Sequence, residues 1–318
     1  MSAGAARVAV VVPVWNAGAT IDDTLAALAA QRLDEPFDVV FVDGGSTDGT
    51  LERLAGAGDT VTVLPNPDRD PASARNLGVR WTTGEVLAFT DADCAPAPDW
   101  LAAGIARLRE LDLVQGRVLP ADDVGPFDRT VSVGAEQGLY ETANLFVRRA
   151  MFERVDGFAP LPGLNLPDGS HFGEDAWFAW RCRRAGARTG FAPDAVVHHA
   201  VHHRNAADFV REQWRTRYFP PLVALIPELR GTFAHHRWFL SPASLRFDVA
   251  VAGALAATAA RRWPPALAGA LPYASWLVKT ARRSGDRPVG VAATYLAADA
   301  LTLAGLVWGS VRARTPLL

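Results

Sequence analysis

A regular alternation of short apolar runs with helix-like stretches constrains the fold of this chain more than any other feature. The first run, VAVVVPV at residues 8–14, is continuously apolar and has the length of a strand that is buried on both faces. Strands that alternate with helices predict βαβ units, and therefore an α/β fold with a mainly parallel central sheet flanked by helices. Further strand-like runs lie at residues 37–42, 61–64 and 85–90, and stretches with helical spacing lie at residues 20–31, 50–55, 72–81 and 99–111.

Beyond residue 111 the alternation is less regular. A further strand is expected at residues 113–119, a loop rich in glycine and proline at 161–173, and a helix at 174–185. We interpret residues 1–240 as one α/β domain and residues 241–318 as a separate, apolar and helical C-terminal region.

The C-terminal region differs from the rest of the chain in charge and hydropathy. Residues 241–318 contain 9 basic and 3 acidic residues, whereas the whole chain has 32 basic and 34 acidic ones. The region has apolar stretches at 249–260, 263–278 and 289–311, and only the last reaches the roughly 20 residues that a membrane span needs. Because Asp299 interrupts it, we expect interfacial or re-entrant helices at an anionic membrane surface. Spanning helices and an ordinary helical subdomain or dimer interface are the alternatives.

The composition excludes several classes of protein. Cys94 and Cys182 are the only cysteines, which rules out a disulfide framework and a cysteine-based zinc finger. No basic stripe with interleaved aromatic residues occurs in residues 1–240, so we expect no nucleic-acid partner. The run at 8–14 is too short for a signal-peptide core and is interrupted by Pro13. We therefore expect a cytoplasmic protein, peripheral or monotopic at the inner face of the cell membrane.

Several polar residues follow strand-like runs, at the sheet edge where α/β proteins bind ligands. Asp43 opens the segment DGGSTDGT, whose glycines allow close approach of a ligand to the backbone. The local interpretation of the same segment is an Asx-type turn followed by a helix cap from Ser46, Thr47 or Asp48.

Asp91 and Asp93 lie directly after the strand-like run at 85–90, in the segment FTDADCAP. Two carboxylates separated by one residue at a strand end can reach one site and hold a divalent cation, with positions left for phosphate oxygens. A lone Asp-x-Asp is common in turns, but the position of Asp43 at the preceding strand end strengthens the binding interpretation.

Two further segments carry charged residues toward the same edge. Asp175, in the segment GED at the start of a predicted helix, could act as a general base that takes a proton from an attacking hydroxyl. A carboxylate in a first helical turn is also favoured by the helix dipole, which is the structural alternative. Arg75, in SARNLG, could reach a nucleotide or lie in solvent.

Four of the seven histidines occur together in HHAVHH at residues 198–203. The preceding segment APDAVV favours a strand that enters the site, with one imidazole completing the shell of the cation. The ligand could be His198, His199 or His202. A zinc hydrolase that used these residues lacks support, because no His-Glu-x-x-His motif is present.

The ordered set of motifs resembles the family 2 glycosyltransferases, which have the GT-A fold. The resemblance covers about residues 6–205 and rests on the order VVPVWN, DGGSTDGT, ARNLG, DAD, TAN, GED and a late histidine. It implies that the backbone of Pro13 and Val14 holds the nucleoside base together with Asp43, that Arg75 supports the base, and that Asp91 faces the ribose. It further implies that Asp93 and His199 bind the metal and that Asp175 is the catalytic base.

The resemblance implies a metal-dependent, inverting transferase. The donor would be a nucleotide-diphosphate sugar, the cofactor Mg²⁺ or Mn²⁺, and the acceptor a hydroxyl of a lipid-linked or glycan molecule. Two alternatives are a sugar-phosphate nucleotidyltransferase and a catalytically silent, membrane-associated scaffold that binds nucleotides. Asp43 can accept a hydrogen bond from uracil, thymine or guanine, so the sequence does not select the base.

Overall fold

The computed structural model describes residues 7–161, 163–166, 171–283 and 287–318, which form two compact units. The first unit comprises residues 1–123 and 130–201, and the second comprises residues 124–129 and 202–318. The domain boundary predicted at residue 240 lies inside the second unit, so residues 202–240 belong with the C-terminal helices.

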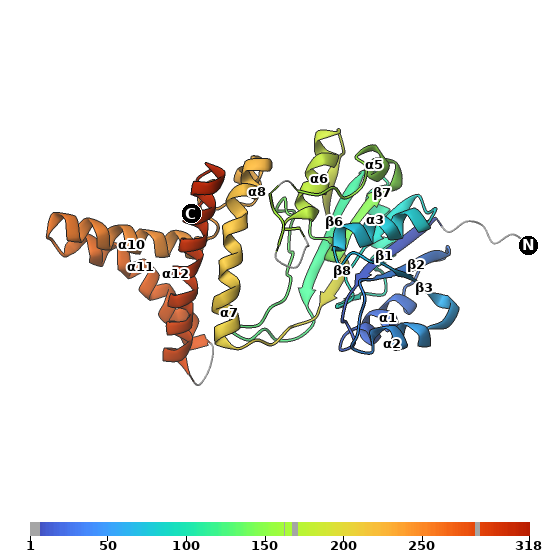
Figure 1. The fold of residues 1–318 in the computed structure, drawn as a ribbon, viewed down its shortest axis with the longest axis horizontal. Helices are drawn as coiled ribbons and strands as arrows, with labels where there is room; N and C mark the ends of the chain where they lie inside the picture. Colours follow the sequence, from blue (N-terminus) through green and yellow to red (C-terminus); the bar gives the residue numbers. More distant parts are fainter. Residues whose placement is uncertain (1–6, 162, 167–170, 284–286) are drawn as a thin grey trace, which may run out of the picture. The chain divides into compact units, whose positions relative to one another are not determined.

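The first unit is built on one eight-stranded sheet with the strand order β3-β2-β1-β4-β7-β6-β8-β5 (Figure 1). Strands β1 to β4 form its parallel half, so their carboxyl ends meet at one edge as predicted. The strands are β1 (Val8–Val14), β2 (Phe37–Asp43), β3 (Thr62–Pro65), β4 (Val86–Phe89), β5 (Cys94–Pro96), β6 (Leu113–Pro120), β7 (Leu145–Arg148) and β8 (Thr189–His199).

The other half of the sheet is mixed, which the sequence did not predict. Strand β7 is antiparallel to both β4 and β6, and β5 is antiparallel to β8. Strands β5 and β7 have three and four residues. Runs this short carry no readable period, so pairing with longer neighbours decides that they are strands.

Helices cover both faces of the sheet. They are α1 (Ile21–Ala29), α2 (Thr50–Gly56), α3 (Pro71–Trp81), α4 (Trp100–Leu108), α5 (Arg149–Arg154) and α6 (Glu174–Arg184), with 3₁₀ turns η1 (Gly58–Thr60) and η2 (Thr142–Asn144). Apart from α5, η1 and η2, these elements and the longer strands agree with the predicted ranges to within a few residues. The predicted loop at 161–173 lies partly outside the described residues, which omit 162 and 167–170.

The alternation of side chains along β1 explains why a continuous apolar run was needed. Val8, Val10 and Val12 pack with α1 and α4 in the main core cluster. Val11 faces the opposite side, where Gly78 of α3 lies so close that an added Cβ would be 2.5 Å from a Val11 methyl carbon. Both faces of β1 are therefore buried, and each buried valine contributes roughly 1.5–3 kcal/mol.

The second unit is helical, as expected for the C-terminal region. Its elements are α7 (Ala206–Glu212), η3 (Gln213–Tyr218), α8 (Phe219–Leu225), α9 (Leu229–Thr232), α10 (Pro242–Ala260), α11 (Pro264–Arg283) and α12 (Pro288–Ala313). A capping box of Ser241 and Ser244 starts α10. Gly253 and Gly269 allow α10 and α11 to approach closely, since a Cβ on Gly253 would lie 2.6 Å from the Pro265 carbonyl oxygen. Among the described residues, α10 and α12 are long and apolar enough to cross a membrane by length and composition.

Candidate functional site

The loop after β2 folds around the carboxylate of Asp43. Asp43 Oδ2 accepts a hydrogen bond from the Gly45 amide at 2.9 Å, and Oδ1 accepts one from the Ser46 hydroxyl at 2.5 Å. Gly45 has a φ of +86°, a conformation in which glycine carries no Cβ penalty. Because the amides of Gly45 and Ser46 both donate to this side chain, the Asx-type turn predicted as the local interpretation is present, and Asp43 is buried.

The predicted helix cap differs in detail. Gly49 occupies the N-cap position of α2 and supplies no side chain. Asp48 instead accepts hydrogen bonds from the Thr50 amide and hydroxyl, while Ser46 accepts one from the Asn16 amide. Of the three residues expected as caps, Asp48 alone reaches the first turn of α2, through Thr50.

The end of β1 packs directly against this loop. The Val14 carbonyl accepts a hydrogen bond from the Gly44 amide at 2.9 Å. A Cβ on Gly44 would lie 3.6 Å from both Trp15 Cβ and Arg69 Cα, which is ordinary van der Waals contact, so the loop packs against both residues. The exposed Trp15 ring has the Arg69 guanidinium 5.4 Å from its centroid. Pro13, Val14 and Asp43 are thus brought to one edge, and an aromatic residue that the sequence analysis did not single out lies beside them.

Arg75 is the electrostatic centre of the site. Its side chain is 4% exposed and lies on α3, with Nη2 3.0 Å from Asp91 Oδ1. Its Nη1 lies 3.4 Å from Glu174 Oε1 and 3.5 Å from Asp175 Oδ1. One buried cation therefore holds together three carboxyl groups, one from the segment after β4 and two from α6. Contact of Arg75 with a nucleotide stays a prediction.

Three carboxylates around one guanidinium change the protonation of the site. Burial by itself would lower the pKa of Arg75, but the carboxylates of Asp175, Asp91 and Glu174 together raise it above its ordinary value. Burial, followed by the Asp175 carboxylate, raises the pKa of Glu174 to about 8. Glu174 is therefore mostly protonated at neutral pH, which brings the cluster closer to electroneutrality.

Asp175 lies in the first turn of α6 and is held from two sides. Its Oδ2 accepts a hydrogen bond from the Thr142 amide at 3.0 Å, and its buried Oδ1 has only the ion pair with Arg75. Burial, with a smaller contribution from Asp175, raises the pKa of the neighbouring Glu141 to about 7. The residue predicted as a base is thus a carboxylate oriented by a backbone amide.

The TAN motif, at residues 142–144, connects Asp175 to the core of the first unit. Asn144 donates hydrogen bonds to the carbonyls of Arg117 and Ala195, both at 2.8 Å, and accepts one from the Trp100 indole at 2.8 Å. These bonds join β6, β8 and α4 behind η2. The motif positions the Thr142 amide that holds Asp175.

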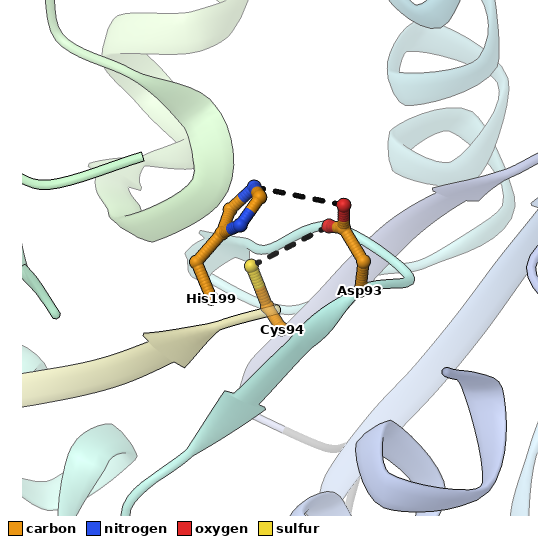
Figure 2. Close-up of side chains that lie close together, drawn as sticks. All are labelled: Asp93, Cys94 and His199. Carbon is orange, nitrogen blue, oxygen red and sulfur yellow. Dashed lines mark hydrogen bonds and ion pairs between the residues drawn. The ribbon is translucent and has the colours of Figure 1, made fainter. Parts of the chain in front are cut away.

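Asp93, Cys94 and His199 converge on one point (Figure 2). His199 Nε2 lies 3.6 Å from Asp93 Oδ2, and Cys94 Sγ lies 3.9 Å from Asp93 Oδ1. His199 Nδ1 is 2.8 Å from the Ala200 carbonyl oxygen. Because a carbonyl only accepts, Nδ1 carries the proton, and Nε2 is the nitrogen that can bind a cation.

The pairing of β5 with β8 distinguishes the histidines. Cys94 pairs with His199 and Ala95 with His198, so successive histidines point to opposite faces of the sheet. His202 lies in the second unit, where its backbone pairs with Arg129. Of the three alternatives, the structure brings His199 to Asp93.

The donors fit a divalent cation. Within the described ranges, Asp93, Cys94 and His199 are the one group of three such side chains with donor atoms within 4.8 Å of one another. The carboxylate oxygen suits Mn²⁺ and Mg²⁺, and phosphate oxygens or water can supply the remaining positions beside the imidazole nitrogen. The adjacent Asp91 is directed to Arg75, so the two acids of DAD have different partners.

The sequence analysis missed four residues at this edge: Trp15, Cys94, Glu141 and Glu174. Cys94 follows Asp93 and Glu174 precedes Asp175, so their positions next to predicted site residues could have identified them. Nothing in the sequence marks Glu141 as half-buried beside Asp175. Trp15 follows a predicted strand directly, and that position could have drawn attention to it.

A mixed sheet of this strand order, with acidic residues at the ends of β2 and β4 and a histidine returning beside them, is the arrangement of the GT-A fold. Residues 9–161 match the family model described as Glycosyl transferase family 2. The match covers 153 of the 318 residues, and together with the fold it supports a family 2 glycosyltransferase.

Curated relatives have the same activity class. Glycosyltransferase AglE of Haloferax volcanii is 29% identical over 252 residues, which cover 73% of this chain and 80% of that protein. Pre-mycofactocin glycosyltransferase of Mycobacterium tuberculosis is 27% identical over 211 residues, covering 60% of this chain and 42% of that one.

Solved structures share the fold. The mannosyltransferase PcManGT of Pyrobaculum calidifontis, in complex with GDP-Man and Mn²⁺, superposes with a TM-score of 0.61 at 23% identity, over 96% of this chain and 87% of that one. TarS of S. aureus in complex with UDP-GlcNAc superposes with a TM-score of 0.52 at 17% identity, over 97% and 92%.

Proposed function

We propose that this glycosyltransferase is inverting and depends on a divalent cation, and that it moves a sugar from a nucleotide-diphosphate sugar to a hydroxyl of a lipid-linked or glycan acceptor. The observation that carries the proposal is the continuous chain of charges from Asp91 through Arg75 to Asp175, with the Asp93–His199 pair beside it. The match to the family model favours sugar transfer over the nucleotidyltransferase that the sequence left open.

The donor half of the site comprises Pro13, Val14, Asp43 and Asp91. We assign the nucleoside base to the loop around Asp43 and the ribose to Asp91. Mg²⁺ or Mn²⁺ held by Asp93 and His199 would neutralise the charge that develops on the leaving diphosphate. The fold relatives in complex with GDP-Man and with UDP-GlcNAc use different bases, so the donor base is left unassigned.

The acceptor half centres on Asp175. A hydroxyl is a weak nucleophile, and a positioned carboxylate that takes its proton contributes typically about 10²–10⁴-fold. The Thr142 amide fixes one oxygen of Asp175, and the neutral form of Glu174 leaves Arg75 to balance Asp175 and Asp91. One base and attack on one face give a single displacement with inversion at the anomeric carbon.

The decisive experiment is Asp175→Asn, with Asp23→Asn as the matched control. Asp23 is also in the first turn of a helix, α1, and is exposed. We expect Asp175→Asn to bind UDP or GDP as the wild type does, while transfer falls by about 10²–10⁴-fold. Asp23→Asn should transfer normally. Wild-type turnover in Asp175→Asn would remove this residue from the mechanism.

The cation assignment has a separate test. Asp93→Ala should remove most of the dependence of nucleotide-diphosphate binding on Mn²⁺, measured by calorimetry with and without the metal. An unchanged response to Mn²⁺ would show that the cation binds elsewhere. A catalytically silent scaffold would bind nucleotide but transfer no sugar from any donor in either experiment.

We further propose that the helical unit contacts an anionic membrane surface on the cytoplasmic side. Leu255, in the C-terminal half of α10, and Trp263, in the turn before α11, are 66% and 71% exposed. Arg261 and Arg262 lie between them. An exposed apolar side chain beside paired arginines suits the boundary between acyl chains and anionic headgroups, where each basic residue contributes about 1 kcal/mol.

Vesicle co-sedimentation tests this contact. The full chain should bind vesicles that contain anionic lipid more tightly than neutral ones, and Leu255→Asp should weaken binding. Leu51→Asp, at an exposed leucine of α2, is the control and should bind as the wild type does. Equal sedimentation of wild type and Leu255→Asp would exclude this part of the unit as the contact.

A further inference from the structure

Cys94 is a metal-ligating group that the proposed transfer reaction does not use. Its side chain is 1% exposed, and its Sγ lies 3.9 Å from Asp93 Oδ1 in the same cluster as His199. Hard cations such as Mg²⁺ and Mn²⁺ prefer oxygen donors, and thiolates select softer cations. The thiol therefore adds a different chemistry to the cation site.

The sheet places the sulfur there. Strand β5 pairs antiparallel with β8 so that Cys94 and His199 are directly opposite, and their side chains share one face. Asp93 immediately precedes the strand, and its carbonyl accepts a hydrogen bond from the Ala200 amide at 2.8 Å. All three donors therefore lie on paired backbone, which fixes them relative to one another before any ligand binds.

The donor spacing is somewhat wider than a tetrahedral cation requires. Metal–ligand distances of about 2.0–2.2 Å for nitrogen and oxygen and about 2.3 Å for sulfur place tetrahedral donors about 3.4 Å apart for the N···O pair and about 3.6 Å apart for S···O. His199 Nε2 lies 3.6 Å from Asp93 Oδ2, and Cys94 Sγ lies 3.9 Å from the other carboxylate oxygen, Oδ1, while one donor atom from each residue lies within 4.8 Å of the others. Side-chain rotations of about 1 Å would bring one oxygen, the nitrogen and the sulfur to tetrahedral spacing.

We propose that Asp93, Cys94 and His199 form a three-donor site that binds a thiophilic divalent cation, of which Zn²⁺ is the type, in the absence of nucleotide. The Cys94 thiol loses its proton to solvent as the metal–sulfur bond forms, and no oxidation state changes. Three protein donors with one open position are the arrangement of exchangeable zinc sites. This inference shares Asp93 and His199 with the proposed function but depends on the sulfur.

Oxygen-preferring and thiophilic cations should therefore differ in whether they need nucleotide in order to bind. Mn²⁺ would have two protein donors here and would need the diphosphate oxygens to bind well. Zn²⁺ would have three and would bind the nucleotide-free protein. A thiophilic cation would then compete with the Mn²⁺–nucleotide complex for Asp93 and His199.

Cobalt(II) provides a spectroscopic readout that is independent of activity. The full chain without nucleotide is titrated with Co²⁺, and the sulfur-to-cobalt charge-transfer band in the near ultraviolet is followed. Cys182, fully buried in α6, provides the matched control. In Cys182→Ser the only remaining thiol is Cys94, so a band in that variant arises from Cys94 alone.

We expect the band in the wild type and in Cys182→Ser, its loss in Cys94→Ser, and a fall in Zn²⁺ affinity of at least about 100-fold in Cys94→Ser. Absence of the band from Cys182→Ser, or its persistence in Cys94→Ser, overturns the proposal. Because the Cys182→Ser spectrum decides by itself, poor folding of Cys94→Ser would not obscure the result.

The same samples separate this inference from the proposed function. Loss of the cobalt band with intact Mn²⁺-dependent binding of UDP or GDP would refute the sulfur ligand and leave the transferase proposal standing. A cobalt band in a protein that transfers no sugar from any donor would refute the transferase proposal and leave the sulfur ligand.

Discussion

Replacing Glu174 by glutamine should make the first unit more stable at high pH and leave its stability nearly unchanged at low pH. The side chain faces Arg75 and Asp175 inside the cluster, and burial raises its pKa from 4.5 to about 8. Glutamine has the shape of the protonated acid but cannot ionise, so the variant removes only the cost of the charged form.

The sign follows from proton linkage. A carboxyl whose pKa is higher in the folded than in the unfolded state favours folding fully below pH 4.5, and this contribution is lost as the pH rises through about 8. Each pH unit between the two values corresponds to about 1.4 kcal/mol, which sets an upper bound of ~5 kcal/mol. The attraction of Arg75 for the ionised carboxyl is already part of this raised pKa, so we expect Glu174→Gln to gain up to about 5 kcal/mol over the wild type at pH 9.

Urea unfolding at pH 5 and pH 9, followed by tryptophan fluorescence, measures the effect. The control is Glu110→Gln, at an exposed carboxylate that pairs with Arg107 on the surface. The difference in free energy of unfolding between Glu174→Gln and the wild type should be near zero at pH 5 and larger at pH 9. The corresponding difference for Glu110→Gln should stay small at both pH values. If the free energies of unfolding of Glu174→Gln and the wild type changed by the same amount between pH 5 and pH 9, a Glu174 pKa raised by burial would be refuted.

Two further substitutions test the packing behind the site. Asn144→Ala should destabilise the protein by about 3 kcal/mol, because it removes three buried hydrogen bonds and leaves the Trp100 indole without its acceptor; an unchanged urea midpoint would contradict this. Gly104→Ala should lower the stability of the protein by about 1–3 kcal/mol, since the new Cβ would lie 2.2 Å from the Phe146 ring. The control is Gly56→Ala, whose Cβ would have no atom within 4 Å. It should be neutral or stabilising in thermal unfolding.

The sequence predicted much of the architecture because its longer elements have readable periods. Continuous apolar runs such as VAVVVPV require burial on both faces, and the helices between them require crossover connections. The parallel half of the sheet and the placement of Asp43 and Asp91 at its edge follow from these two requirements.

The mixed half of the sheet could not be predicted in the same way. Strands β5 and β7 are too short to show a period, and their direction is set by the neighbours with which they pair. The choice of His199 over His198 depends on that pairing, because shifting β5 by one residue against β8 would present the other histidine to Asp93.

By itself, then, the sequence determined the order of the elements, the apolar faces and the positions of the acidic residues along the chain. Tertiary structure decided which of those residues act together. Arg75 and Glu174 are 99 residues apart in the chain and meet only when α3 and α6 pack on the sheet. The raised pKa of Glu174 and the grouping of Cys94 with Asp93 and His199 arise from burial and strand register, which depend on distances in space that no local sequence pattern encodes.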